Sequence, residues 1–320
     1  MTPVPPPSLP RTPRLLSVVV PAYNEVQSLP LLLERLRGVL APLVKYEIVI
    51  VDDGSRDGTV DYLRRANAER PEVRYLSFSR NFGHQNALRA GLVEARGDCV
   101  VTMDADLQHP PEILRDLLAR WGEGADVVYT VRRDDDASWF KRKSSALYYR
   151  VLSALSDDPP VPGSADFRLL DRRVVDVFVE LKEHTMFLRG LVPWVGFRQA
   201  EVAYTQDARR AGVTKYSVRR MMRFAVEGVT ATSIRPLIIA SMFGMFLAFT
   251  ALVYAGYAIY IRVATGTAVP GWASTVVVVA LIGGTQLIFL GVLGAYVGQI
   301  LREVRGRPPY LVRERSGEPT

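Results

Sequence analysis

Two carboxylates stand one residue apart directly after an apolar run of the sequence. Residues 98–114 read DCVVTMDADLQHPPEIL, so Asp104 and Asp106 follow a stretch typical of a buried strand and precede a Pro-Pro pair that can open a helix. Two negative charges held this close repel each other unless a cation lies beside them. Mg²⁺ or Mn²⁺ suits such hard oxygen ligands, and Mg²⁺ typically adds water and phosphate oxygens. The pattern indicates a site for a metal and a diphosphate, although D-x-D alone also occurs in solvated acidic turns.

The elements that must position these carboxylates alternate in type from residue 15 to about residue 133. Short runs rich in Val and Ile, such as SVVV, EIVIV and CVVTM, are separated by amphipathic stretches such as LPLLLERLRGVL. This alternation predicts an α/β fold with a mostly parallel sheet covered on both faces. Ligands of such sheets bind beyond the carboxyl ends of the strands, so we expect four polar clusters to meet at one edge. The clusters are PAYNE (21–25), DDGSRDG (52–58), SRNFG (79–83) and DADLQ (104–108).

The last third of the chain has a different composition. Positions 236–261 and 272–301 contain no charged residue, and each stretch exceeds the roughly 20 residues that cross a bilayer. A buried core helix is the alternative interpretation. Arginines lie on both outer flanks, whereas Arg262 is the sole charge between the stretches, and the positive-inside rule therefore places both flanks in the cytoplasm.

Charge and cysteine content bound the class of protein. The 320 residues carry 40 Lys and Arg against 33 Asp and Glu, a formal net charge of +7, which points to a polyanionic partner: nucleic acid, anionic lipid or a phosphorylated substrate. The single cysteine, Cys99, excludes an internal disulfide, and its place in an apolar run predicts a buried thiol and a reducing compartment. Residues 1–14 are rich in proline and are expected to form a disordered tail.

Two further segments have a basic and an apolar face at helical spacing. They are residues 138–156 and residues 215–232. Such helices are suited to lying on an anionic membrane leaflet, and the alternative is that each packs its apolar face on the domain.

The four clusters, taken with three later segments, resemble the family 2 glycosyltransferases of GT-A fold. The later segments are 163-GSADFRLLDRRVV-175, 184-HTMFLRGLVPWVGFRQ-199 and 209-RRAGVTKYSVRRM-221, so the resemblance covers roughly residues 16–230. Within the family, the chain is most similar to the polyprenyl-phosphate glycosyltransferases, the dolichyl-phosphate mannose synthase and GtrB-like group. The resemblance implies a cytoplasmic GT-A domain at 15–233, a two-helix transmembrane hairpin at 234–301 and a cytoplasmic basic tail at 302–320.

The resemblance also implies roles for residues on the donor side. Metal and diphosphate ligands match Asp104, Asp106 and Gln108. The nucleoside-binding edge matches Pro21, Tyr23, Glu25, Asp52 and, more weakly, Asp53. Arg132 matches a basic residue near the diphosphate. Of the histidines, His84 is expected to be a donor-side polar contact or a surface residue, and His109 is a candidate contact of the pyrophosphate.

The acceptor side is assigned in the same way. A basic loop that would face the donor and acceptor phosphates contains Arg209, Arg210 and Lys215, and an arginine fork matches phosphate geometry. Asp166 matches the residue proposed as catalytic base in GtrB-like enzymes. Because a phosphate monoester is already largely ionised at neutral pH, Asp166 is equally open to interpretation as an orienting residue paired with a basic group, or as a structural loop residue.

The implied activity is inverting transfer of a sugar from a nucleotide diphosphate donor to a polyprenyl phosphate such as undecaprenyl phosphate, for cell-envelope glycosylation. UDP-glucose is the expected donor; GDP-mannose or another UDP-sugar is the alternative. The cofactor would be Mg²⁺ or Mn²⁺ and the location the cell membrane, multi-pass. The expected partners are an anionic leaflet, a lipid-linked sugar flippase, a downstream glycosyltransferase and further copies of the chain, with no nucleic acid.

Two competing functions have specific marks in the sequence. A processive polysaccharide synthase would carry Q-x-x-R-W, and the nearest string, 299-QILRE-303, lacks the tryptophan. A non-catalytic nucleotide-sensing membrane scaffold would be marked by loss of Asp104 or Asp106, and both are present.

Overall fold

A computed structural model describes residues 11–132, 161, 163–181, 183, 188–205, 233–266 and 271–317 of the chain. These residues fall into two compact units. One is an α/β domain that also includes residues 307–317, and the other is a helical unit that ends at Gly306.

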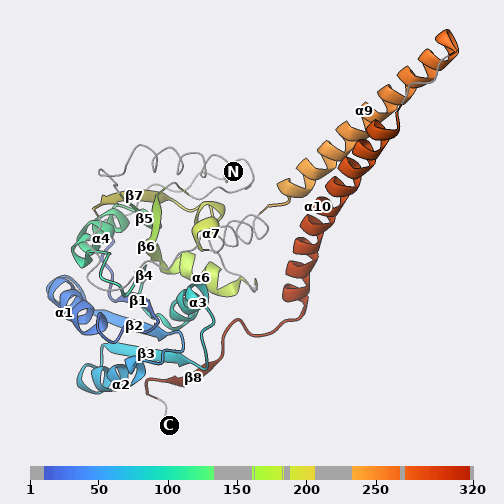
Figure 1. Ribbon diagram of the computed structural model, residues 1–320. Helices are drawn as coiled ribbons and strands as arrows, with labels where there is room; N and C mark the ends of the chain where they lie inside the picture. The colour runs from blue at the N-terminus through green and yellow to red at the C-terminus, as the bar shows by residue number, and fades with distance from the viewer. Residues whose placement is uncertain are drawn as a thin grey trace. The chain divides into compact units, whose positions relative to one another are not determined.

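The α/β domain contains one eight-stranded sheet (Figure 1). The strands in chain order are β1 (Leu16–Ala22), β2 (Tyr46–Asp52), β3 (Val73–Phe78), β4 (Cys99–Thr102), β5 (Val127–Arg132), β6 (Ser164–Asp171), β7 (Gln199–Tyr204) and β8 (Val312–Arg315). Their order across the sheet is β7-β5-β6-β4-β1-β2-β3-β8. Strands β6 and β8 run antiparallel to their neighbours, and the other pairings are parallel. The predicted mostly parallel sheet is confirmed.

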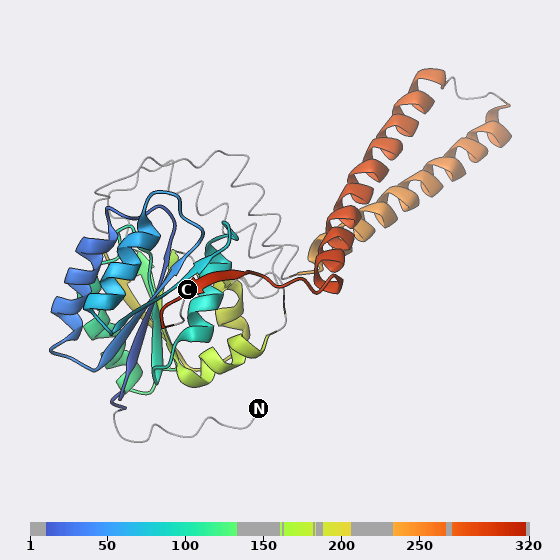
Figure 2. The ribbon, with the colours of Figure 1, turned by 90° about the horizontal axis from the view of Figure 1, so that it is seen from below.

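Helices cover both faces of this sheet, as Figure 2 shows. One face packs against α1 (Leu29–Leu40), α2 (Thr59–Glu69) and α4 (Leu114–Gly122), the last preceded by the short 3-10 helix η1 (Pro111–Ile113). The other face packs against α3 (His84–Glu94), α6 (Arg172–Glu180) and α7 (Leu188–Trp194). Because both faces are covered, the central strands are buried along their whole length, which explains their continuous apolar runs. Cys99 lies on β4 as the predicted buried thiol, and burial raises its pKa.

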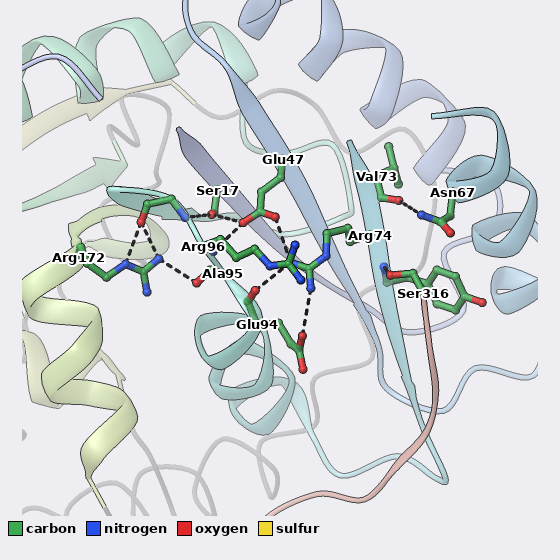
Figure 3. Close-up of polar contacts among 12 residues, drawn as sticks. Ser17, Glu47, Asn67, Val73, Arg74, Glu94, Ala95, Arg96, Arg172 and Ser316 are labelled. Carbon is green, nitrogen blue, oxygen red and sulfur yellow. Dashed lines mark hydrogen bonds and ion pairs between the residues drawn. The ribbon is translucent and has the colours of Figure 1, made fainter. Parts of the chain in front are cut away.

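A buried polar network holds α3 against the sheet (Figure 3). Glu47 on β2 accepts hydrogen bonds from Ser17 Oγ at 2.6 Å, from the Arg96 backbone N–H at 2.7 Å and from Arg74 Nη1 at 3.0 Å. Arg74 also pairs with Glu94, the last residue of α3, at 3.2 Å. A buried carboxylate is tolerated only when its charge is paired and its oxygens accept hydrogen bonds, as here. The network fixes the end of α3 that lies away from His84.

The chain before β1 differs from the sequence-based prediction. Arg11 belongs to the expected disordered tail, yet its Nη1 atom lies 3.1 Å from carboxylate oxygens of both Asp126 and Asp171. The Arg14 backbone N–H donates to Asp98 at 2.7 Å. The prediction is therefore wrong for residues 11–14, because two nearly buried carboxylates from distant parts of the chain are paired with this arginine. Residues 1–10 lie outside the described part of the chain.

The chain after the apolar stretches also differs. Residues 312–315 form β8, which pairs with β3 as the last strand of the sheet. The separate basic tail predicted at residues 302–320 is therefore wrong for this segment, which belongs to the α/β domain. The error arose because a four-residue strand rich in charge has no apolar alternation to reveal it.

The helical unit consists of α9 (Arg235–Thr265) and α10 (Trp272–Val304). Within them, Arg235–Ala264 and Leu281–Val304 have mean hydropathies of 2.2 and 1.6, and none of the apolar window of either is buried. Phe243 and Phe289 meet edge to face, and the Tyr296 hydroxyl donates to the Ser233 carbonyl at 2.6 Å. A core helix of a soluble domain would be mostly buried, whereas no residue of either apolar window is buried, as expected of helices that face lipid. They are long and apolar enough to cross a membrane.

Candidate functional site

The strand directions bring the predicted site residues to one end of the sheet. The six strands that run in the same direction finish there, which we call the carboxyl end, and the antiparallel β6 begins there. Three of the polar clusters follow β1, β2 and β3, Asp104 and Asp106 follow β4, and Asp166 lies near the start of β6. The expectation that these clusters meet at one edge follows from this topology.

The Asp104–Gln108 loop alternates in burial. Asp104, Asp106 and Gln108 are partly exposed, whereas the residues between and after them, Ala105, Leu107 and His109, are buried. Leu107 has φ of 63°, which is unusual for a residue other than glycine, and the Gln108 backbone N–H donates to Asp106 Oδ1 at 3.1 Å. The two carboxylates and the Gln108 amide therefore lie on the same, partly exposed side of the loop.

His109 supports this loop from beneath. Its Nδ1 atom accepts a hydrogen bond from the Asp104 backbone N–H at 3.1 Å. Its ring stacks on Phe167 of β6, with centroids 5.0 Å apart, and meets Tyr204 of β7 at 5.9 Å. The buried imidazole thus ties the loop to two other strands, and its Nε2 atom lies 3.9 Å from Asp104 Oδ2.

Asp166 is held by an arginine that the sequence analysis did not single out. Arg168 is 2% exposed and Asp166 5% exposed. Arg168 Nη2 lies 3.1 Å from Asp166 Oδ1 and donates to the Ala165 carbonyl at 2.9 Å. On the neighbouring strand, Thr102 Oγ1 donates to the Asp166 carbonyl oxygen at 2.5 Å. The available signal was an arginine inside an apolar strand, a position where a charge needs a partner.

His84 lies between the two acidic parts of the site. It is the first residue of α3, and its Nε2 atom is 3.5 Å from Asp104 Oδ1 and 3.5 Å from Asp166 Oδ2. Its side chain is 42% exposed and makes both of these polar contacts. The imidazole therefore links the proposed metal ligands to Asp166.

The loop after β1 is bonded to the loop after β2. The Asn24 backbone N–H donates to Ser55 Oγ at 2.8 Å, and Asn24 Oδ1 accepts from the Arg56 backbone N–H at 2.9 Å. Glu25 accepts from the hydroxyl of Ser28 within its own loop. Pro21 is buried in β1, whereas Tyr23 is 45% exposed. Tyr23 therefore presents an exposed aromatic ring at this end of the sheet.

The adjacent aspartates at the end of β2 have their carboxylates turned inward. Asp52 is fully buried and accepts from Ser77 Oγ at 2.6 Å and from the Ser55 backbone N–H at 3.1 Å. Asp53 accepts from the backbone N–H groups of Phe82 at 2.6 Å and Gly83 at 2.9 Å, and burial raises its pKa. Both residues lie at the expected edge, where their carboxylates hold the loops 52–58 and 79–83 in place.

The donor set fits a hard divalent cation. Among the described residues, no group of three or more His, Cys, Asp or Glu side chains is arranged to hold a metal. The Asp104–Gln108 loop instead offers two carboxylates and one amide oxygen. Such a partial shell suits Mg²⁺ or Mn²⁺, which fill the remaining positions with water and diphosphate oxygens.

Of the four predicted basic residues of the site, the structure describes one. Arg132 ends β5 at the carboxyl end of the sheet and is exposed, with its backbone N–H donating to the Gly163 carbonyl at 3.2 Å. The three predicted phosphate-binding residues, Arg209, Arg210 and Lys215, lie outside the described residues. The amphipathic segments 138–156 and 215–232 also lie outside them.

The chain is similar to a known family and to several known proteins. Residues 17–178 match the model of the family described as glycosyl transferase family 2. The uncharacterized glycosyltransferase YkcC of Bacillus subtilis is 41% identical over 304 residues, which cover 94% of each chain. The bactoprenol glucosyl transferase of Shigella phage SfX is 36% identical over 304 residues, which cover 94% of this chain and 99% of that protein. Among solved structures, mannosyltransferase PcManGT of Pyrobaculum calidifontis, in complex with GDP-Man and Mn²⁺, is 19% identical, with a TM-score of 0.49 over 95% of this chain and 90% of that chain.

Proposed function

The chain belongs to glycosyltransferase family 2, and on that premise we propose that it transfers a sugar, with inversion, from a nucleotide diphosphate to a polyprenyl phosphate. The proposed donor is UDP-glucose and the proposed acceptor is undecaprenyl phosphate. Full-length similarity to proteins named bactoprenol glucosyl transferase supports this choice. So do the two helices that are apolar enough to place the enzyme at a membrane.

One observation carries the proposal at the level of chemistry. His84 Nε2 lies 3.5 Å from Asp104 and 3.5 Å from Asp166, so a diphosphate-binding loop and a second acidic group face the same space. The acceptor phosphate has a second pKa of about 6, so its attacking oxygen is largely ionised at neutral pH without a base. A bare carboxylate beside this dianion would repel it. Arg168 partly neutralises Asp166, which supports an orienting role for Asp166.

The departing nucleotide diphosphate is the second place where charge must be stabilised. We assign Asp104, Asp106 and Gln108 to the divalent cation, which when bound supplies positive charge beside the leaving group. Arg132 is assigned to the diphosphate, and the basic loop with Arg209, Arg210 and Lys215 to the donor and acceptor phosphates. Preorganised positive groups of this kind are the largest contribution to many enzymatic rates.

The membrane setting completes the proposal. The arginine flanks support an α/β domain and termini in the cytoplasm, with the product formed on the inner leaflet. The basic segments 138–156 and 215–232 would rest on anionic lipid there. A sugar linked to lipid on that side needs a flippase and a downstream transferase to reach the cell envelope, and self-assembly of the chain is part of the same proposal.

The proposal is tested with the full-length protein in nanodiscs that contain undecaprenyl phosphate. Radiolabelled UDP-glucose, UDP-galactose and GDP-mannose are supplied in turn with Mg²⁺ or Mn²⁺, and label in the lipid extract is counted. We expect transfer from UDP-glucose, no transfer after chelation, and none by the Asp106→Asn variant. Donor binding by calorimetry without lipid labelling from any donor would overturn the proposal and favour the nucleotide-sensing scaffold.

A further inference from the structure

The edge strand β8 contains a β-bulge beside the donor loops. Leu76 pairs with Arg315 and Ser77 with Glu314, but Phe78 pairs with Val312, so Arg313 is an extra residue in the ladder. A bulge interrupts the alternation of side chains along a strand and can redirect one of them. Here Arg313, which regular pairing would place opposite Phe78, reaches Ser77 instead.

The redirected guanidinium begins a chain of hydrogen bonds into the site. Arg313 Nη2 donates to Ser77 Oγ at 3.1 Å, and Ser77 Oγ donates to Asp52 Oδ2 at 2.6 Å. Asp52 accepts from the Ser55 backbone N–H at 3.1 Å, and Ser55 Oγ accepts from the Asn24 backbone N–H at 2.8 Å. We call these contacts the Arg313 relay. They connect β8 to both loops of the nucleoside edge.

The residues beside the bulge contact the third loop of the site. Tyr310 stacks on Phe78, with ring centroids 4.9 Å apart, and the Leu311 carbonyl accepts from the Ser79 backbone N–H at 2.9 Å. Phe78 in turn meets Phe82 edge to face at 5.7 Å. Segment 310–313 therefore packs along the loop that leads to His84.

Other contacts hold β8 in place independently of Arg313. Arg64 forms a bidentate pair with Glu314, at 3.0 Å through Nε and 2.6 Å through Nη2, and the Tyr75 hydroxyl donates to Glu314 at 3.1 Å. Beyond the strand, Ser316 Oγ accepts from the Tyr75 backbone N–H at 3.2 Å, at the sheet edge seen in Figure 3. Removal of the Arg313 side chain leaves all of these contacts intact, so Arg313 is not needed to dock the strand.

We propose that Arg313 is a positioning residue for the nucleotide of the donor. Through Ser77 it restrains the carboxylate of Asp52, which sets the 52–58 loop and, through Ser55, the loop that carries Tyr23. The inference rests on the proposed function, with the donor nucleoside placed at these two loops as the family resemblance implies. It adds that the segment following α10 in the chain is part of the donor site.

The test compares Arg313→Gln with Arg315→Gln in the full-length protein in nanodiscs. Arg315 lies on the same strand but pairs with Glu94 at 3.4 Å, outside the relay, and is the matched control. The measurements are the dissociation constants of UDP and GDP, the KM of donor and of lipid acceptor, and the midpoint of thermal unfolding. We expect Arg313→Gln to raise both the dissociation constant of the cognate nucleotide and the donor KM about tenfold. This is the loss typical of one hydrogen bond that involves a charged group, here the bond from Arg313 to Ser77. Acceptor KM should be unchanged, and the unfolding midpoint should match that of Arg315→Gln.

A second variant tests the path through which Arg313 acts. Ser77→Ala removes the hydroxyl that joins Arg313 to Asp52. The double variant, Ser77→Ala with Arg313→Gln, should therefore bind the nucleotide no more weakly than the single variant Ser77→Ala. Equal nucleotide affinity in Arg313→Gln and Arg315→Gln would overturn the inference, as would additive losses in the double variant. The nucleotide dissociation constants test the Arg313 relay without any sugar transfer. A wild-type protein that binds UDP but labels no lipid therefore contradicts the proposed function alone. A wild-type protein that binds neither nucleotide overturns both.

Discussion

Arg168 and Asp166 form an ion pair inside the domain, with Nη2 and Oδ1 3.1 Å apart and neither side chain more than 6% exposed. A base that takes a proton from its substrate works best when its pKa lies near the working pH. A carboxylate paired with a buried guanidinium is instead stabilised in its charged form. The pair therefore favours an Asp166 that orients its neighbours.

Asp166→Asn should lower the transfer rate without changing its pH profile. The amide keeps the size of the side chain but loses the charge that faces His84 and Arg168. Since the acceptor phosphate has a second pKa of about 6, no proton has to be removed between pH 7 and 9. The measurement is kcat across that range at saturating donor and acceptor. A variant whose rate recovers as the pH rises would show that Asp166 is a base.

Replacement of Arg168 should destabilise the domain through the charge that it leaves behind. Arg168→Leu strands the nearly buried Asp166 carboxylate, and breaking such a pair typically costs about 3–5 kcal/mol of unfolding free energy. The variant Asp166→Asn with Arg168→Leu removes both charges and should recover part of that loss. Urea denaturation of the two variants checks this, and a double variant no more stable than Arg168→Leu would contradict it.

Asp104→Ala and Asp106→Ala should each nearly abolish transfer while the fold remains intact. Both carboxylates lie on the partly exposed side of their loop, so their removal leaves the buried residues in place. Electrostatic groups of this kind typically contribute 10²-fold or more to the rate, so about a hundredfold loss or more is expected. The assay uses saturating Mn²⁺, with thermal unfolding as the check on folding. More than about a tenth of the wild-type rate would contradict the metal assignment, given that expected loss.

Labelling with an impermeant thiol reagent should show both flanks of the helical unit inside the cell. A cysteine that replaces Thr267, between α9 and α10, should react from outside intact cells, and one that replaces Gly306 should not. The native Cys99 is fully buried and burial raises its pKa, so background labelling should be low. The reverse pattern would refute the orientation that the arginine flanks predict.

The stability contributed by Glu314 should disappear in acid. Its hydrogen bonds with Arg64 lower its pKa below the ordinary value of 4.5. The folded state therefore binds fewer protons there than the unfolded state does, and the contribution is present above pH 4.5 and lost as the pH falls through the lowered pKa. The difference in unfolding midpoint between wild type and Glu314→Gln should thus shrink from pH 6 to pH 3. A difference that stays constant over this range would show that the charge of Glu314 does not stabilise β8.

The sequence alone determined the features that depend on local pattern. The amphipathic stretch LPLLLERLRGVL corresponds to α1, Leu29–Leu40, and the apolar run before Asp104 contains β4, because burial imposes a period on the residues of each element. The uncharged stretches correspond to two long apolar helices, because their length and uniform apolar composition suit a membrane span. Parallel strands finish at one end of a sheet, so the meeting of the polar clusters also followed from the sequence.

Tertiary structure alone decided which side chains from distant parts of the chain come into contact. Arg11 pairs with Asp171, His84 lies between Asp104 and Asp166, and Arg313 reaches Ser77, a residue 236 positions earlier in the chain. None of these contacts has a signal in the surrounding sequence, because a charged residue that will pair across the sheet has the same local pattern as one that will face water. Their formation depends on strand order, on the register of β8 and on the bulge at Arg313, which arise only when the whole sheet assembles.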